Sequence, residues 1–451
     1  MQRAYTAAVT ERFQRRLGGR GRALCFLAIF ALGLGLRLDY AIRAPNHPVD
    51  DARAYARISR ALHRGEGFTQ GDGPGYRHLQ PASNYAPGLP LLAAGLYAVR
   101  GAADEEAARI VLALLGSLAI PLAFLLGRRL GGLDAGLIAM LPVAIYPALL
   151  EYGGMLMTEP IATALLAGVL LCLLRACELR RPLPWIGTGL LLGALALLRP
   201  EYSILIPLLP GLALIRLHRE RGRFQRDLLS GPALAIACAC LVVLPWTVRN
   251  LVVFDRLVPI STGGGQLLYE GSYLPAGPDP ERFTPVFLEE YPWIGRELAP
   301  QPGPIYRGQA AALLAAREHP GESTDTALRG MAVDAYAHAL VHEPLRLGGF
   351  LAGKVWLAWT GAAREAMREP IWRALQILLL VAAAIGLVVG LVRRSFEAVL
   401  LAVVFAAFTL VQLAFIASPR RTLVLVPELG ALAGLGLTWS VARLRGDSLP
   451  P

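Results

Sequence analysis

The sequence contains little charge and almost no lysine. Only 17% of its 451 residues are charged and 55% are hydrophobic, whereas a soluble domain is about 25% charged. Lys354 is the only lysine, so arginine carries the net charge of +11. The arginines lie in short clusters beside apolar blocks, where membrane-orientation signals are found. The composition therefore favours a membrane protein, and we predict no nucleic-acid partner.

The sequence also lacks the patterns of a disulfide framework, a metal centre or a soluble phosphate-binding loop. Its five cysteines lie inside apolar blocks without disulfide or metal spacing. His338 and His342 are four residues apart, but the neighbouring Glu343 does not complete a metal signature. The glycine-rich stretch at 258–273 lacks the Lys-Ser/Thr pair of a phosphate loop, and indicates a close backbone approach, a mobile lid or a plain surface loop. A divalent metal is the one cofactor left open, with no ligands assigned.

Long apolar blocks separate the polar segments. A helix needs about 20 residues to cross the hydrocarbon core, and helices satisfy their own backbone N–H and C=O groups there. We therefore predict an all-α polytopic membrane protein with about ten spanning helices (10–12). Two shorter apolar segments, 87–100 and 345–361, could either span or lie in the interface. We favour the interface, because a span at 87–100 would place the arginine clusters at 127–129 and 175–181 outside. The expected spans are 23–43, 107–128, 133–150, 158–176, 184–199, 201–217, 229–248, 371–392, 396–416 and 422–442.

The placement of arginine predicts the orientation of the chain. When every arginine cluster is assigned to the cytoplasm, ten spans fit and both termini are cytoplasmic. Residues 1–22 then form a basic cytoplasmic N-terminus. The apolar run that follows is interpreted as an uncleaved first helix, with a signal peptide as the alternative. The two long polar segments, 44–104 and 249–344, face the outside, so we expect an inner (plasma) membrane protein with its polar face extracytoplasmic. The clusters used lie at 12–22, 127–129, 175–181, 216–226, 393–394 and 443–445.

Acidic residues lie at the predicted outer face. Asp50 and Asp51 follow Pro48 at the start of an expected helix, where they are either an ordinary pair of N-terminal acids or a general base. Glu159 in MLMTEP opens a spanning helix with Pro160 next to it, and is either a helix-start glutamate or part of the same site. Ionisable groups near membrane depth are costly, so they are tolerated best around a shared polar cavity.

Arginines lie at the same helix ends as these acids. Any single arginine there can extend its charge to water. Several of them beside acids on one face indicate an anionic ligand, because the guanidinium group binds phosphate through two parallel hydrogen bonds. The arginines and the acid concerned are Arg109, Arg199, Glu201, Arg249, Arg420 and Arg421.

Several segments together resemble the GT-C membrane glycosyltransferases. The resemblance is to the bacterial families related to the protein O-mannosyltransferases and the lipid A aminoarabinose transferase, and it extends through most of the chain. It implies a GT-C-like bundle, with a catalytic transmembrane module at 23–248 that includes the loop 44–104, an extracytoplasmic loop region at 249–344, and C-terminal helices at 345–451. The segments are VDDARAYARISRALHRGEGF, NYAPGLPLL, LGRRLGG, MLMTEP, ALLRPEY, PWTVRNLVVFDRLVPISTGGG and HEPLRLGGFLAGKVW.

The resemblance implies a polyprenyl-phosphate sugar donor and chemistry on the outer face of the membrane. Asp50 would be the catalytic base of an inverting transfer, Glu159 the second acidic residue, and Arg109 an arginine near the donor. The lysine-proline segment of these families is replaced here by NYAPGLP, which has no lysine. Phosphate contacts would then come from other residues, such as Arg77, His78 or Arg420.

Other functions are compatible with such a chain. A polymerase or ligase acting on lipid-linked oligosaccharide would have a similar topology. A transporter is disfavoured because the charges gather at one side and no repeated halves with broken helices are evident. A non-catalytic lipid-binding protein would leave the acids unexplained. The acceptor, which could be a glycan, a lipid or a protein, is not assigned.

Overall fold

The computed structural model describes residues 19–43, 50–69, 81–82, 84–221, 227–300 and 304–445, without the side chains of Asp50 and Asp227. In these ranges the chain is helical, and the only β-type pairing is an isolated bridge between Thr69 and Pro81. The predicted all-α fold class is confirmed. Most of the predicted basic N-terminus, residues 1–18, lies outside the described ranges.

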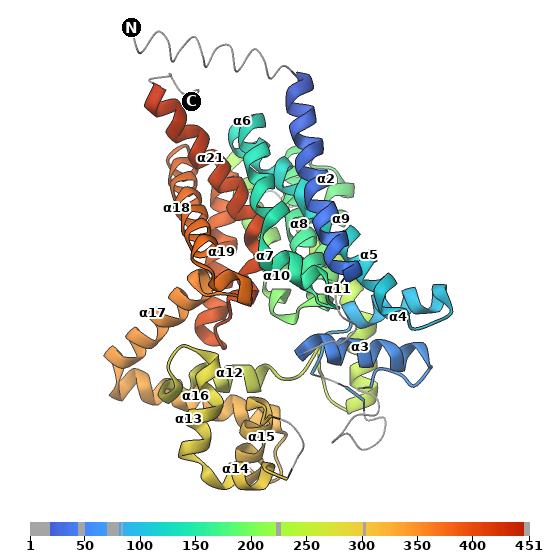
Figure 1. Ribbon diagram of the computed structural model, residues 1–451, viewed down its shortest axis with the longest axis vertical. Coiled ribbons are helices and arrows are strands. Elements are labelled where there is room, and N and C mark those ends of the chain that lie inside the picture. The colour runs from blue at the N-terminus through green and yellow to red at the C-terminus, as the bar shows by residue number, and fades with distance from the viewer. Residues whose placement is uncertain are drawn as a thin grey trace.

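A bundle of long apolar helices makes up one part of the molecule (Figure 1). Its helices are α2 (Gly19–Arg43), α5 (Glu105–Ser117), α6 (Ala119–Ile145), α8 (Glu159–Leu179), α9 (Pro182–Leu198), α10 (Leu205–Arg221), α11 (Asp227–Phe254), α18 (Pro370–Val392), α19 (Phe396–Ala414) and α21 (Val426–Arg445).

Shorter helices gather at one end of this bundle. They are α3 (Asp50–His63), α4 (Gly88–Arg100), α7 (Pro147–Gly153), η1 (Pro200–Ile204), α12 (Gly264–Ser272), η2 (Leu274–Ala276), η3 (Pro280–Arg282), α13 (Phe283–Glu290), α14 (Pro292–Leu298), α15 (Arg307–Glu318), α16 (Thr324–His342), α17 (Pro344–Thr360), η4 (Glu365–Arg368), α20 (Pro419–Thr422) and η5 (Leu423–Leu425).

The long helices correspond to the spans expected from the sequence. By length and hydropathy, 8 stretches of the described chain can cross a membrane. One of them, Glu105–Ile145, doubles back at Gly131 and Gly132, where Gly132 has φ 84°, so it supplies both arms predicted at 107–128 and 133–150. Helix α9 has only 17 residues but packs between α8 and α11. When the hairpin arms and α9 are counted separately, each predicted span has its helix.

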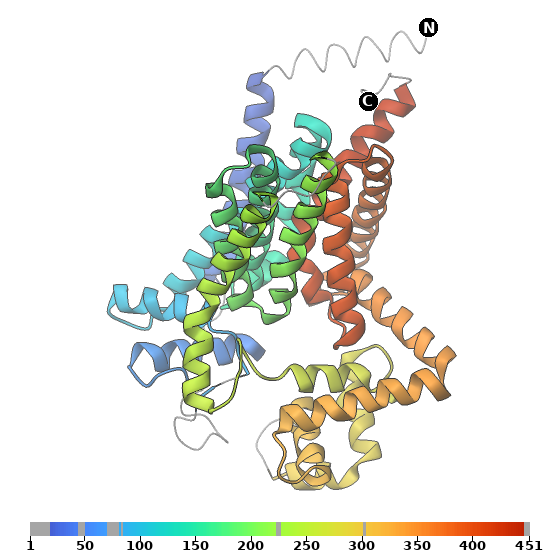
Figure 2. The ribbon, with the colours of Figure 1, turned by 180° about the vertical axis from the view of Figure 1, so that it is seen from behind.

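The two ends of the bundle differ in what they carry. The start of α2 and the end of α21 lie at one end, and α3, α4 and α12 to α17 lie at the other (Figures 1 and 2). Helices α4 and α17, which cover the apolar segments 87–100 and 345–361, lie outside the bundle of long helices (Figures 1 and 2). The two long polar segments therefore lie at the same end, as the arginine clusters predicted.

Helix α21 packs between α6 and α18 through small residues. Gly430 and Gly434, one turn apart, face the second arm of α6, and a Cβ atom at Gly434 would overlap the carbonyl of Ala135. Small residues at this spacing let membrane helices approach closely, which strengthens van der Waals contact where the hydrophobic effect does not drive association.

Helices α12 to α16 form a separate helical unit with its own apolar core. The core is built from aromatic residues in α12, directly after it and in α13, and from aliphatic residues of α14 to α16. Its large members are Tyr269, Tyr273, Phe283, Phe287, Ile294, Leu298, Leu314 and Leu328. We call this unit, residues 264–342, the α12–α16 unit. It follows the bundle helix α11 and leads into α17.

Replacing Gly434 with alanine tests the α6–α21 packing. The added methyl group would meet backbone that cannot move aside, so Gly434→Ala should lower the free energy of unfolding by about 1–3 kcal/mol. Gly211→Ala in α10 is the control, because a Cβ atom there has nothing within 4 Å and alanine favours the helix. Thermal unfolding in detergent measures both, and equal midpoints would contradict the packing.

Labelling of added cysteines tests the orientation. Glu297 in α14 and Arg181 between α8 and α9 are both exposed, at opposite ends of the bundle. In intact cells a membrane-impermeant maleimide should modify Glu297→Cys and spare Arg181→Cys, with the unaltered protein as background. Labelling of Arg181→Cys alone would invert the topology.

Candidate functional site

Three helices, α8, η1 and α20, begin at the end of the bundle that carries the short helices, and each has a proline in its first turn. Pro160 follows Glu159 in α8, Pro200 follows Arg199 in η1, and Pro419 precedes Arg420 in α20. Proline suits a first turn because that turn needs no N–H donor. Glu159, in the first turn of α8, is also favoured by the helix dipole. The proline starts thus hold charged side chains at one end of the bundle.

These side chains form a connected set with Asp51, from the first turn of α3. Arg420 lies at the centre: its Nε donates to Glu159, and its Nη1 donates to Asp51 Oδ2 at 2.6 Å. Arg199 Nη1 donates to the same oxygen of Glu159, Oε1, at 2.8 Å. We call the set the acid–arginine network; its members are Asp51, Glu159, Arg199, Glu201, Arg420 and Arg421.

Glu201 and Arg421 extend the network on one side. Arg199 Nε donates to Glu201 Oε1 at 2.9 Å, and Arg421 Nε lies 3.9 Å from that oxygen. Arg421 also donates to the carbonyl of Ile416. The network thus pairs three carboxylates with three guanidinium groups, which offsets the large cost of burying unpaired charge.

Glu159 is the most deeply buried member of the network. Its side chain is 0% exposed, and its second oxygen, Oε2, has no hydrogen-bond partner among the described residues. A buried acceptor without a donor is costly. A polar ligand that donates a hydrogen bond could therefore gain affinity at this oxygen.

Three tyrosine side chains lie beside the acid–arginine network. The Arg420 guanidinium lies 5.5 Å from the centre of the Tyr152 ring, and that of Arg199 lies 5.6 Å from the Tyr202 ring. Tyr55 of α3 is buried, and its burial, together with the charge of Asp51, raises the pKa of its hydroxyl. The hydroxyl therefore stays protonated and can donate or accept a hydrogen bond at the edge of the site.

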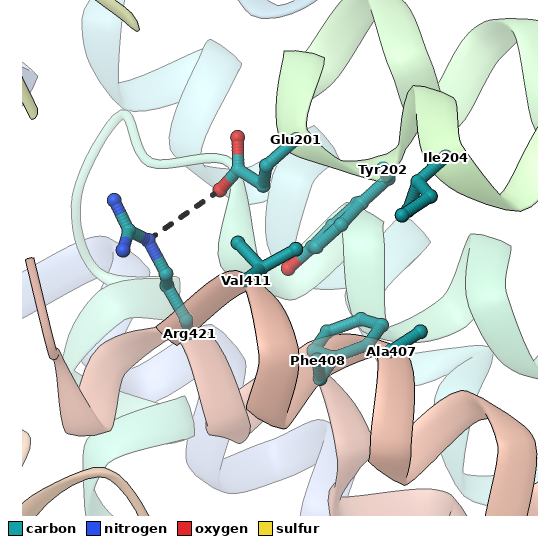
Figure 3. A pocket seen from close by; sticks show the side chains of 7 residues that line it. All are labelled: Glu201, Tyr202, Ile204, Ala407, Phe408, Val411 and Arg421. Atoms are coloured by element: carbon teal, nitrogen blue, oxygen red, sulfur yellow. Dashed lines mark ion pairs between the residues drawn. The ribbon is translucent and has the colours of Figure 1, made fainter. Parts of the chain in front are cut away.

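A small pocket opens beside Arg421 (Figure 3). Arg421 and Glu201 form its charged end. The remainder is apolar, and includes the stacked rings of Tyr202 and Phe408, whose centroids are 4.9 Å apart. The other lining residues are Ile204, Ala407 and Val411. The pocket lies between η1 and α19, with Arg421 of α20 at its charged end, so a charged pair and an apolar wall face the same space.

Six residues singled out from the sequence meet in this network: Asp51, Glu159, Arg199, Glu201, Arg420 and Arg421. Asp50 is the first residue of α3, next to Asp51, and its side chain is outside the description. Arg77 and His78 lie outside the described residues.

Arg109 and Arg249 have other surroundings. Arg109 is buried, and its Nε donates to the carbonyl of Ala41 near the end of α2, at 3.0 Å. Arg249 packs against aromatic rings, at 4.8 Å from the ring centre of Trp246, and donates to Asn250 Oδ1 at 2.9 Å. Arg249 was predicted with the phosphate-binding group because it ends an apolar block, but the fold of α11 directs it to these rings.

The glycine-rich stretch has a structural role in this fold. The N–H groups of Gly263 and Gly265 donate to Asp325 Oδ1 at 2.9 and 2.8 Å. Asp325 belongs to α16, so the stretch joins α12 to α16. This supports the close-approach alternative for 258–273, since a carboxylate of the chain already occupies these backbone donors.

The described residues contain no cluster of three or more His, Cys, Asp or Glu suited to a metal ion. The carboxylates of Asp51, Glu159 and Glu201 are all paired with arginine. His338 and His342, singled out by their spacing, lie in contact with ring centroids 4.5 Å apart and ring planes tilted by 38°.

Comparison with known proteins agrees with this architecture. Residues 84–248 match the family model described as dolichyl-phosphate-mannose-protein mannosyltransferase. That segment runs from the entry to α4 into α11, and it contains Glu159 and Arg199. No curated protein sequence matches the chain.

Solved structures show the same fold. The apo oligosaccharyltransferase of Archaeoglobus fulgidus superposes with a TM-score of 0.55 and 16% identity, over 93% of this chain and 51% of that one. The AglB oligosaccharyltransferase of the same organism, in complex with an inhibitory peptide and a dolichol-phosphate, gives 0.52 and 15%, over 94% and 52%. ArnT from Cupriavidus metallidurans bound to undecaprenyl phosphate gives 0.40 and 16%, over 95% and 80%, which is too loose to carry an argument.

The protein is therefore a multi-pass membrane protein with the fold of the GT-C membrane glycosyltransferases, as its sequence resemblance implied. Within that class, its segment 84–248 is similar to the dolichyl-phosphate-mannose-protein mannosyltransferase family. The chain spans about half the length of the archaeal oligosaccharyltransferases that it matches.

Two substitutions in α8 test whether the network is a buried charge cluster. Glu159→Ala leaves Arg199 and Arg420 without their shared partner, and should lower the free energy of unfolding by about 3–5 kcal/mol. Glu178, at the other end of α8, pairs with Arg129 and its side chain is 37% exposed, so Glu178→Ala should cost under about 1 kcal/mol. Denaturation in detergent measures the difference, and equal losses would argue against a buried network.

Proposed function

We propose that this protein is a glycosyltransferase that moves a sugar from a polyprenyl-phosphate-linked donor to an acceptor at the extracytoplasmic face of the inner (plasma) membrane. The observation that carries the proposal is the convergence of Asp51, Glu159, Arg199 and Arg420 from four distant parts of the chain. The family match over 84–248 and the fold support it.

The donor phosphate is assigned to the arginine side of the network. Arg420 and Arg421 are adjacent in α20, and Arg421 lies at the charged end of the pocket in Figure 3. A lipid phosphate is an anion, and guanidinium groups bind it through charge-assisted hydrogen bonds. The apolar wall of Ile204, Phe408 and Val411 would contact the first part of the isoprenoid chain. A matched archaeal structure holds dolichol-phosphate, a lipid of this class.

Asp50 is assigned as the general base. Asp51 is already bound to Arg420, which leaves its neighbour at the start of α3 as the carboxylate to accept a proton from the acceptor. The deprotonated acceptor attacks the anomeric carbon, the bond from that carbon to the phosphate oxygen breaks, and polyprenyl phosphate leaves with its charge stabilised by arginine. One displacement inverts the anomeric centre.

A second candidate is transfer of a whole oligosaccharide from a lipid carrier. The fold match to oligosaccharyltransferases favours it. Both candidates use the same phosphate-binding arginines, and they differ in the size of the transferred glycan. The acceptor is a glycan, a lipid or a protein.

Transfer by the purified protein in liposomes tests the proposal. A labelled polyprenyl-phosphate sugar and a lipid-linked oligosaccharide are offered to wild type, Asp50→Asn, Asp51→Asn and Glu159→Gln, with Glu178→Gln as the matched control. The Asp50→Asn variant lacks the general base, so its rate of sugar transfer should fall by about 100-fold or more. The Glu178→Gln control should keep its activity. Product analysis should show an inverted anomeric centre.

Each outcome of this assay separates the hypotheses. Preserved transfer by Asp50→Asn, with loss in Asp51→Asn, would move the base to Asp51. A retained anomeric configuration would exclude a single displacement. Binding of polyprenyl phosphate without transfer of either glycan would favour a non-catalytic lipid-binding protein.

A further inference from the structure

Lys354, the only lysine of the chain, is buried in α17. Its side chain is 1% exposed. The Nζ atom donates to the carbonyl of Gly271 at 2.9 Å, to the carbonyl of Leu413 at 2.7 Å and to the hydroxyl of Tyr336 at 3.1 Å. Burial, and to a smaller extent the charge of Arg421, lower the pKa of Lys354 to about 7. The cost of burying this group indicates that its contacts matter to the fold.

The three acceptors suit an ammonium group. Lysine presents three N–H donors around one compact charge, whereas the planar guanidinium of arginine is built for two parallel bonds. Gly271 and Leu413 lie at the ends of α12 and α19, where the partial negative charge of the helix dipole attracts a cation. In a chain otherwise rich in arginine, this position holds the one basic side chain shaped for three converging oxygens.

These contacts join the α12–α16 unit to the bundle. Gly271 belongs to α12 and Tyr336 to α16, whereas Leu413 belongs to the spanning helix α19. The Tyr336 hydroxyl lies within hydrogen-bond distance of the carbonyls of Gly271 and Ala414, at 2.7 and 2.8 Å. One buried charge on α17 therefore connects three other helices.

The ends of α12 and α19 contact the backbone segment 415–418, which leads directly to Arg420 and Arg421. Ile416 N–H donates to the carbonyl of Leu267 in α12 at 3.1 Å. A Cβ atom at Gly271 would overlap the backbone of Phe415. The side chain of Gln412 binds both the N–H and the carbonyl of Ser418, at 2.7 and 3.0 Å.

Helix α17 also contacts α20 itself. The Thr422 hydroxyl donates to the carbonyl of Ala358, one turn after Lys354, at 2.9 Å. Arg421 donates to the carbonyl of Ile416, inside the held segment. A short backbone segment between α12, α17 and α19 therefore sets the positions of Arg420 and Arg421. Lys354 binds the ends of two of these helices, α12 and α19.

We propose that Lys354 is a positioning residue, which fixes segment 415–418 and thereby places Arg420 and Arg421 in the acid–arginine network. It touches neither the carboxylates of the network nor the pocket beside Arg421. Its effect on lipid-phosphate binding rests on the proposed function, whereas its effect on the segment does not.

Hydrogen–deuterium exchange of the full-length protein in nanodiscs tests the geometric part. Lys354→Met keeps the length and apolar stem of the side chain and removes the charge. Peptides covering 415–423 should exchange about tenfold faster, the factor expected when a charge-assisted hydrogen bond is lost, while peptides of α2 and α9 should keep their rates. Arg346→Met is the control, because Arg346 lies on the same helix and is exposed. Unchanged exchange at 415–423, or an equal increase throughout the chain, would overturn the proposal.

A double-mutant cycle tests the functional part, with undecaprenyl phosphate as the probe. Lys354→Met should weaken its binding about tenfold in the wild-type background, and should have little further effect in Arg420→Met/Arg421→Met, because the positioned groups are then absent. Equal losses in both backgrounds would show that Lys354 does not act through these arginines. Absence of binding by the wild type would refute the proposed donor, and the exchange experiment would still decide the role of Lys354.

Discussion

The burial of Glu159 between two guanidinium groups is the constraint on which the site depends. A carboxylate that is fully removed from water at the edge of an apolar bundle is stable only if opposite charge surrounds it. Arg199 and Arg420 supply that charge from helices far away in the sequence. The pairing therefore fixes where α8, η1 and α20 begin relative to one another, and Asp51 attaches α3 to the same point.

This arrangement holds the site together through several shared ion pairs, and it suits the phosphate ligand of the proposed function. The arginines are shared among several carboxylates, so an incoming phosphate can compete for their donors without leaving any acid far from positive charge. Arg199 connects Glu159, whose Oε2 has no hydrogen-bond partner among the described residues, to Glu201 at the charged end of the pocket. Electrostatic preorganisation of this type is the main means by which an enzyme stabilises a departing anion.

The part of the chain outside the bundle contributes to the same site through its backbone. The α12–α16 unit has its own aromatic core, yet its first helix pairs with the segment before Arg420. The buried ammonium of Lys354 lies where these parts meet. A few residues thus make the structural connection between the α12–α16 unit and the acid–arginine network.

The sequence alone determined the properties that depend on local composition. Apolar length predicted the spanning helices, and the distribution of arginine predicted that both long polar segments share one end. The acids and arginines at helix ends were also visible, because ionisable groups in an apolar sequence are few. Hydropathy could not give the direction of each side chain. Charged residues occur at many helix ends, and the hydropathy pattern is the same whether or not their side chains meet.

Only the tertiary structure decided which charges meet. It paired Arg420 with both Asp51 and Glu159, directed Arg249 to Trp246 instead, and used Asp325 to bind the glycine-rich stretch. It also turned Lys354, one residue in an ordinary apolar helix, into a contact between four helices. These outcomes depend on how helices distant in sequence pack, because a hydrogen bond or ion pair requires atoms within a few ångströms, and helix packing alone brings them so close.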